Sequence, residues 1–337
     1  MNSLQRILST AALERPDRPA VAPQLFGFAA QQLGVDLGRY VREGKVMARC
    51  QLKARERFGT DMLFAISDVG VETEATGSEL IYHDHDYPTV GEYAIHSAAG
   101  VEGLGVPTPE RDGRMPEILT AIKTMRAAVK DTCPVVGCVL GPMTLAAQLM
   151  GPENVLFLSH DEPEAFEALL HQATAIVQAY GAAQVEAGAH VVLVFDPAAS
   201  PTVFPKATFI RYEQNLLATI FSSLGRAGAP LKWLHIAGPI APIMEHMREI
   251  GVQILSIDQS IPSYEVQEHM PKVCVVGNIN CLSLLQEEPS LIKADCDRLL
   301  EEYSQRGGLI LSSACEVPPM TPSANIMAMV RAAKDWK

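Results

Sequence analysis

The chain has 337 residues, a formal net charge of −12 and a hydrophobic content of 48%. This length suits two average domains or one large α/β barrel. No Lys/Arg-rich stripe is present, so we expect no nucleic-acid partner. No uninterrupted apolar stretch reaches the length of a membrane span, and the N-terminus has no apolar signal core. Seven scattered cysteines are typical of a reduced, cytoplasmic protein.

Short apolar runs recur along the chain, each followed by a turn and a helical pattern. Near-continuous apolar runs are typical of strands covered on both faces, as in a parallel sheet. Eight such units predict a single (β/α)8 TIM barrel over residues 1–337, with a short N-terminal helical extension. A doubly wound open sheet is the alternative, but no Gly-x-Gly-x-x-Gly follows the first strand. The expected strands are 19–25, 62–67, 135–140, 190–195, 231–236, 252–257, 273–276 and 309–313.

The connection after the second expected strand is unusually long. Residues 79–114 are rich in Gly, Pro, His and Asp and have no clear periodicity. Long loops within compact domains are usually functional or act as lids. We expect this loop to overhang the mouth of the barrel, because it leaves the carboxyl end of a strand.

Catalytic groups of such barrels come from the carboxyl ends of the strands. An Asp at a strand end is often only a helix cap, a His can be a satisfied core residue, and a lone Cys is usually a buried hydrophobe. The convergence of several such groups on one mouth nevertheless favours an active site. The candidates are Gln24, Phe26, Asp68, Asp196, His235, Asp258, Asn278, Asn280 and Cys315.

His235 and Cys315 are the only imidazole–thiol pair at these strand ends. They follow the fifth and eighth strands, which lie across the barrel from each other. Zinc binds imidazole and thiolate, and a catalytic zinc site keeps one position open. We therefore predict zinc on this pair and assign the third ligand first to Glu316. The other candidates for that position are Asp258, Glu72 and the loop segment 83–86, His-Asp-His-Asp, for which a solvated loop is the alternative.

Several segments resemble the uroporphyrinogen decarboxylase superfamily. They are Asp-Met-Leu-Phe-Ala-Ile-Ser-Asp-Val-Gly-Val-Glu-Thr-Glu-Ala-Thr-Gly (61–77), Gly-Pro-Met-Thr-Leu-Ala (141–146), Asp-Pro-Ala-Ala-Ser (196–200), Gly-Asn-Ile-Asn (277–280) and the tail 308–334. The resemblance covers nearly the whole chain and implies a barrel fold.

The resemblance is closer to the cobalamin-dependent methyltransferase branch than to the decarboxylases. The decarboxylases have an Arg-containing N-terminal segment that holds substrate carboxylates, whereas the corresponding residues 22–30 contain no Arg. In the methyltransferases a His-x-Cys pair and a distant Cys hold zinc. His235 and Cys315 match that set, but position 237 is Ala, which puts a thiol acceptor in doubt.

The resemblance implies methyl transfer between a small molecule and a corrinoid. Such a reaction needs a Lewis acid or a general acid for a methoxy or N-methyl donor, and we assign the acid role to Asp68 or Glu72. Gln24, Phe26, Asp196, Asn278 and Asn280 are assigned to substrate or corrinoid binding. No Asp-x-His-x-x-Gly motif is present, so a small corrinoid-binding protein is the expected partner. The alternatives are a decarboxylase or lyase for a smaller substrate, and a non-catalytic tetrapyrrole- or corrinoid-binding protein.

Overall fold

Eight parallel strands form one continuous sheet in the computed structural model, which describes residues 1–336. Their order is β1-β10-β9-β8-β7-β6-β5-β2, so every predicted strand is present and neighbours in sequence are neighbours in space. The strands are β1 (Ala20–Val21), β2 (Leu63–Phe64), β5 (Val135–Leu140), β6 (Val191–Phe195), β7 (Leu231–His235), β8 (Ile254–Ser256), β9 (Cys274–Ile279) and β10 (Leu309–Ser313).

The two ends of this sheet meet at Asp61. Its backbone N–H donates to the carbonyl oxygen of Val21 at 2.8 Å, and its carboxylate accepts the N–H of Val21 at 3.0 Å. These bonds join the first strand to the start of the second and complete the ring. The predicted (β/α)8 barrel is therefore confirmed.

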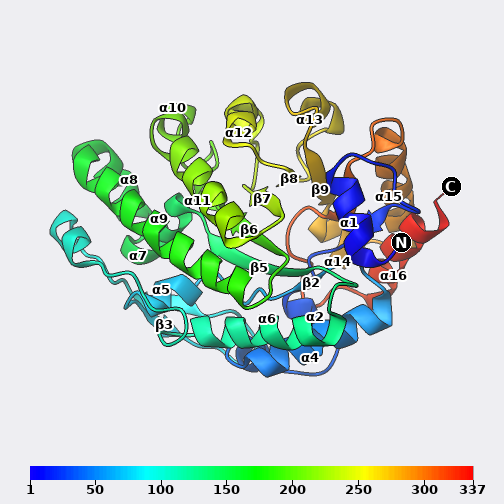
Figure 1. The fold of residues 1–337 in the computed structure, drawn as a ribbon, viewed down its shortest axis with the longest axis horizontal. Helices are drawn as coiled ribbons and strands as arrows, with labels where there is room; N and C mark the ends of the chain where they lie inside the picture. Colours follow the sequence, from blue (N-terminus) through cyan, green and yellow to red (C-terminus); the bar gives the residue numbers. More distant parts are fainter. Residues whose placement is uncertain (337) are drawn as a thin grey trace.

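Most of the helices surround the strands on the outside of the ring, whereas Ile7 and Ala11 of α1 pack with the interior cluster (Figure 1). Helix α1 precedes β1, as predicted for the N-terminal extension, and begins with a capping box between Asn2 and Gln5. The helices are α1 (Ser3–Ala11), α2 (Gly27–Gln31), α3 (Leu37–Tyr40), α4 (Gly44–Phe58), α5 (Val71–Ala75), α6 (Met115–Val129), α7 (Pro142–Met150), α8 (Pro152–Asp161), α9 (Pro163–Glu186), α10 (Lys206–Thr208), α11 (Gln214–Ala227), α12 (Met244–Ile250), α13 (Ser263–His269), α14 (Cys281–Gln286), α15 (Pro289–Tyr303) and α16 (Ser323–Asp335).

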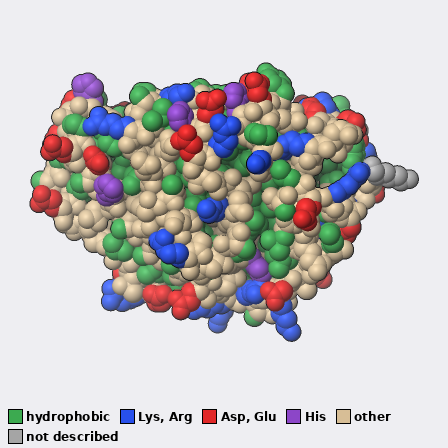
Figure 2. All heavy atoms as spheres, turned by 45° about the horizontal axis from the view of Figure 1, so that its top comes forward, with side chains coloured by type: hydrophobic (Ala, Val, Ile, Leu, Met, Phe, Trp, Pro, Cys, Tyr) green, Lys and Arg blue, Asp and Glu red, His purple; other side chains and the backbone are tan. Residues whose placement is uncertain are grey.

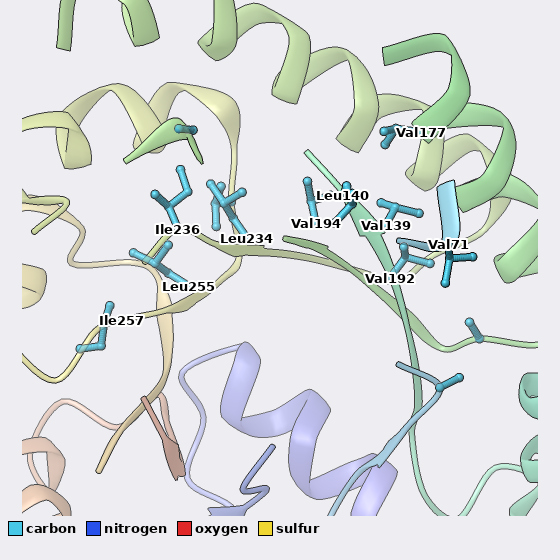
Figure 3. Close-up of a cluster of buried hydrophobic side chains, with 14 of the residues drawn as sticks. Val71, Val139, Leu140, Val177, Val192, Val194, Leu234, Ile236, Leu255 and Ile257 are labelled. Carbon is cyan, nitrogen blue, oxygen red and sulfur yellow. The ribbon is translucent and has the colours of Figure 1, made fainter. Parts of the chain in front are cut away.

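Alternate side chains of the strands fill two separate apolar layers. Val191, Leu193 and Trp233 point into the barrel, while Val192 and Val194 point outward to the helices. Figure 3 shows part of the outer layer, including side chains from β5, β6, β7 and β8. Burial of both faces explains why these strands are apolar throughout rather than alternating.

The long connection of residues 79–114 is more ordered than its sequence predicts. It contains a two-stranded antiparallel sheet, β3 (Glu79–Ile81) and β4 (Thr89–Glu92), and a 3-10 turn at Ala98–Gly103. The N–H of Ile95 donates to the carbonyl of Leu149 at 3.0 Å, which fastens the connection to α7.

Charged side chains of both signs are interspersed over the face drawn in Figure 2. Among residues 1–336, no helix is both long and apolar enough to cross a membrane.

Candidate active site

The mouth of the barrel brings His235 and Cys315 together. Cys315 Sγ lies 4.0 Å from His235 Nε2, although β7 and β10 are not neighbours in the sheet. The contact therefore spans the interior of the barrel, as predicted from the two strand ends.

His235 is a buried imidazole with a free nitrogen. Its side chain is 1% exposed, and its ring stacks on Phe195 with a centroid distance of 4.7 Å. Nδ1 has no hydrogen-bond partner among residues 1–336. Burial lowers the pKa of His235 to about 4, against a smaller opposing effect of the Asp258 carboxylate. The ring is therefore neutral at pH 7 and has a lone pair available for a metal or a proton.

Cys315 is a half-buried thiol at the other side of the mouth. Burial raises its pKa to about 11, and nearby Cys281 and Glu316 add to this effect. Without a cation beside it, the sulfur therefore carries its proton at neutral pH. Cys281 was not among the predicted site residues. Cys281 lies two residues after the end of β9, and Cys315 lies two residues after the end of β10. The two strands end in register, because Ile279 pairs with Ser313.

Glu316 is hydrogen-bonded to Tyr87 of the long connection. Its Oε1 accepts hydrogen bonds from the Tyr87 hydroxyl and from the N–H of Gly27, the latter at 3.1 Å. Burial raises the pKa of Glu316 to about 7, despite the opposing hydrogen bonds. Over residues 1–336, no three His, Cys, Asp or Glu side chains converge in a way that could hold a metal ion.

Asp68 is part of a buried ion pair. Arg114, from the start of α6, donates to its two carboxylate oxygens at 2.5 and 3.0 Å. The N–H of Gly70 and the hydroxyl of Ser67 donate to the same carboxylate. Arg114 also pairs with Glu74 at 2.7 Å, so its charge is balanced locally. This bonding favours an anchoring role for Asp68 over that of a proton donor.

Glu72 is better suited to hold a proton. It is 2% exposed, and its only side-chain hydrogen bond within residues 1–336 is from the N–H of Leu140 to Oε1 at 2.8 Å. Burial raises the pKa of Glu72 to about 7.

Asp196 caps a helix, although not the one that follows it. Its Oδ1 accepts from the N–H and the hydroxyl of Thr144, at 2.8 and 2.6 Å, in the first turn of α7. Gly141 permits this approach, because a Cβ there would lie 2.2 Å from Asp196 Cγ. Behind Asp196 lies Glu213, fully buried, with both carboxyl oxygens unpartnered among the described residues. Burial raises the pKa of both acids, and Asp196 adds to the effect at Glu213.

Two further candidates, from the first strand end, are buried. Phe26 packs edge-on against Phe64 inside the barrel, with ring centroids 5.4 Å apart. The Gln24 amide donates weakly to the carbonyl of Ser313 at 3.4 Å, while its Oε1 is buried without a partner among residues 1–336.

The two asparagines after β9 make local hydrogen bonds. Asn278 donates to the carbonyls of Asp258 and Ile261, at 3.1 and 2.9 Å, and so holds the loop after β8. Asn280 is the N-cap of α14 and accepts from the N–H of Leu282 at 2.8 Å. Their assignment to substrate or corrinoid contact stays a prediction.

The rim of the mouth carries acidic but no basic side chains from the strand ends. The five residues that follow each of the eight strands include Asp68, Asp196, Asp258 and Glu316, and none is Lys or Arg. Arg114, which binds Asp68, is already paired with Asp68 and Glu74. An anionic substrate group would therefore find no free counter-ion among these segments.

The fold and the site define a TIM barrel with an imidazole and a thiol facing each other at its mouth. A family model for uroporphyrinogen decarboxylase (URO-D) matches residues 2–336. The chain belongs to the uroporphyrinogen decarboxylase family.

The proteins similar to this chain include methyltransferases and decarboxylases. The methylcobamide:CoM methyltransferase MtaA of Methanosarcina barkeri is 32% identical over 241 residues, which span 70% of this chain and 68% of MtaA. Uroporphyrinogen decarboxylase of Anaeromyxobacter dehalogenans (strain 2CP-C) is 27% identical over 311 residues, spanning 88% of this chain and 87% of that enzyme. A solved structure described as a methyltransferase from Methanosarcina mazei is 27% identical and has a TM-score of 0.90, covering 100% of this chain and 99% of the other.

Proposed function

We propose that this protein is a methyltransferase that moves a methyl group between a small molecule and a corrinoid held by a separate protein. The observation that carries the proposal is the approach of Cys315 Sγ to His235 Nε2 at the mouth of the barrel. The similarity to MtaA and to the Methanosarcina mazei methyltransferase supports methyl transfer over decarboxylation.

Zinc fits two of the side chains at this site. His235 offers a neutral imidazole and Cys315 a thiol, which are the ligand types that zinc prefers. When bound there, zinc would act as a Lewis acid on the donor or acceptor atom. Glu316 is our candidate for a third ligand, since Tyr87 and Gly27 occupy only its Oε1, but its side chain would have to turn toward the pair, because the three groups do not converge here.

We propose a methoxy or N-methyl compound, rather than an anionic thiol, as the small molecule. Position 237 is Ala, so the sulfur-rich ligand set of the methyltransferase branch is incomplete. Fewer thiolate ligands make zinc a stronger Lewis acid, which suits an oxygen or nitrogen leaving group. The absence of Lys and Arg from the strand-end segments also disfavours a sulfonate such as coenzyme M, and a substrate with many carboxylates.

The corrinoid partner would dock over the mouth, where residues 79–114 lie. Tyr87 fastens this connection to Glu316 beside Cys315. Docking therefore requires the connection to move or to form part of the interface.

The proposal is tested by turnover with a reduced corrinoid protein and two sets of substrates. One set contains thiols, including coenzyme M, and the other contains methoxylated and N-methylated compounds. We expect demethylation in the second set, and zinc bound at about one ion per chain. Cys315→Ser should lose most of that zinc. Rapid methylation of coenzyme M without any reaction in the second set contradicts the proposed donor class, and unchanged zinc in Cys315→Ser contradicts the metal site.

A further inference from the structure

The wall of the barrel opens between β2 and β5 just below the mouth. The two strands pair only at Leu63 with Val135 and Phe64 with Val136. Further along β5, the N–H of Leu140 donates to Glu72 Oε1 rather than to the neighbouring strand. The carboxyl group of Glu72 thus takes the place of a missing strand residue.

A small cavity lies in this gap. Its volume is about 10 Å³, close to the space that one water molecule needs, and its polar lining includes Asp68, Glu72, Cys138 and Tyr180. Tyr180 is 1% exposed, and it lines this cavity together with Glu72. Because Glu72 and Tyr180 both line a cavity of this size, a water that bridges their polar groups is favoured here.

The charges around the gap are largely balanced except at Glu72. Asp68 is bound by Arg114, and the phenol of Tyr180 and the thiol of Cys138 have pKa values raised well above their usual range by burial. These two groups are therefore uncharged. Glu72 is the acid of this group that can exchange a proton near neutral pH, since burial raises its pKa to about 7.

The cavity adjoins the interior of the barrel. Cys138 lies in the middle of β5 and packs on the interior apolar cluster, yet it is only half-buried. The cavity is lined by Ile66 and Cys138 of the interior cluster and by Val139 and Tyr180 of the outer cluster, so it lies within the wall of the barrel.

We infer that one water molecule binds in this gap between Glu72 and Tyr180, and that Glu72 supplies through it the proton taken up by the leaving group of the methyl donor. The second part rests on the proposed function. In this step the bond from the methyl carbon to oxygen or nitrogen breaks, and its electron pair stays on the heteroatom. The methyl group would bond to the reduced cobalt of the partner's corrinoid, which supplies the electron pair of the new bond and so loses two electrons. The heteroatom takes a proton from the water, and Glu72 donates its own proton to that water. Solvent then reprotonates Glu72.

The water and the acid are tested on the full-length protein without any substrate. A high-resolution crystal structure should contain a water within hydrogen-bond distance of Glu72 and of the Tyr180 hydroxyl, and Tyr180→Phe should lose it. Infrared spectroscopy should show carboxyl bands of Glu72 and Glu316 that titrate near pH 7, and Glu72→Gln should lose the first while it keeps the second. Glu79→Gln, which changes an exposed acid on β3, is the matched control and should retain both bands. A gap without water, or a Glu72 band that titrates like an exposed glutamate, overturns the inference.

The proton transfer is tested with two donors that differ in their leaving groups. Glu72→Gln should slow demethylation of an alkyl methyl ether by about 100-fold and remove an ionisation near pH 7 from the rate profile. A quaternary N-methyl donor leaves as a neutral amine and needs no proton, so its rate should hardly change. An equal loss for both donors, or an unchanged pH profile, refutes the transfer through Glu72. If wild-type protein demethylates neither donor, the proposed function fails, while the crystal and infrared results still decide the water site.

Discussion

Cys315 Sγ and His235 Nε2 lie 4.0 Å apart across the mouth of the barrel, although 80 residues separate them in the sequence. The contact depends on the closure of the ring, because β8 and β9 lie between the two strands in the sheet. The fold therefore creates the pair, and no local segment contains both groups.

We predict that Ala237→Cys raises zinc affinity and lowers the natural activity. The new thiolate would lie two residues beyond His235 and would donate more charge to zinc than an oxygen ligand does, which weakens the Lewis acid. Competition with a zinc chelator measures the first effect and turnover measures the second. Ala227→Cys, at the exposed end of α11, is the control and should change neither. Unaltered zinc affinity in Ala237→Cys would count against a metal at this strand end.

Gly141→Ala should destabilise the protein by about 2 kcal/mol or more. The added Cβ would lie 2.2 Å from the buried Asp196 Cγ, so the cap of α7 must shift. Gly225→Ala is the matched control, because no atom lies within 4 Å of its added Cβ in α11. That change should stabilise the helix by about 0.5–1 kcal/mol. Urea unfolding measures both, and similar free energies of unfolding for the two variants would contradict the account of Gly141.

Asp61→Asn should cost about 3 kcal/mol, because the half-buried Arg18 loses its carboxylate partner and the buried Arg6 keeps only Asp17. Asp61 accepts from Arg6 at 2.7 Å and from Arg18 at 2.9 Å, and it also joins the first and second strands. The control is Asp297→Asn, which removes a partly exposed pair with Lys293 and should cost at most about 1 kcal/mol. Thermal and urea unfolding measure the free energy of unfolding of both variants and of wild type. A loss below 1 kcal/mol for Asp61→Asn would show that the ring closes without this cluster.

The stability of the protein should depend on pH through Glu72. Folded Glu72 keeps its proton up to about pH 7, whereas the usual pKa of glutamate is 4.5. The stability that the raised pKa of Glu72 contributes is fully present below pH 4.5 and is lost as the pH rises to about 7. The loss is on the order of 3 kcal/mol, since each pKa unit corresponds to about 1.4 kcal/mol.

Glu72→Gln should therefore gain stability relative to wild type as the pH rises over this range. Free energies of unfolding at several pH values measure the difference, with Glu79→Gln as a control that should show no such trend. A constant difference between Glu72→Gln and wild type across pH 4.5–7 would mean that Glu72 is not desolvated in the folded protein.

The barrel was predictable from the sequence because its strands are apolar throughout and are separated by amphipathic helices. His235 and Cys315 were predictable as a pair because strand ends of a barrel converge. The ion-pair and hydrogen-bond partners of the predicted acids could not be predicted from the sequence. Arg114 lies beyond a long irregular connection, and nothing in the sequence links it to Asp68.

Other contacts could not be predicted from the sequence, for different physical reasons. Glu213 is an acid within a helical pattern, where an exposed position is the normal expectation, yet it is fully buried behind Asp196. Tyr87 lies beside a run of charged loop residues, and only the three-dimensional course of that loop brings it to Glu316. The hydrogen bonds of Asn280 could have been predicted, since Asn before a helix is a common N-cap.

The most direct test of the central claim is the cobalt spectrum of a reduced corrinoid protein mixed with methyl donors and this protein. Methylation of cobalt changes the visible absorbance, so the rate of methyl transfer can be followed without isolating products. We predict rapid methylation with wild-type protein and a methoxy or N-methyl donor, and a loss of at least about 100-fold in both Cys315→Ser and His235→Asn. Equal rates for wild type and these two variants, in properly folded protein, would contradict a methyl-transfer site at the mouth of the barrel.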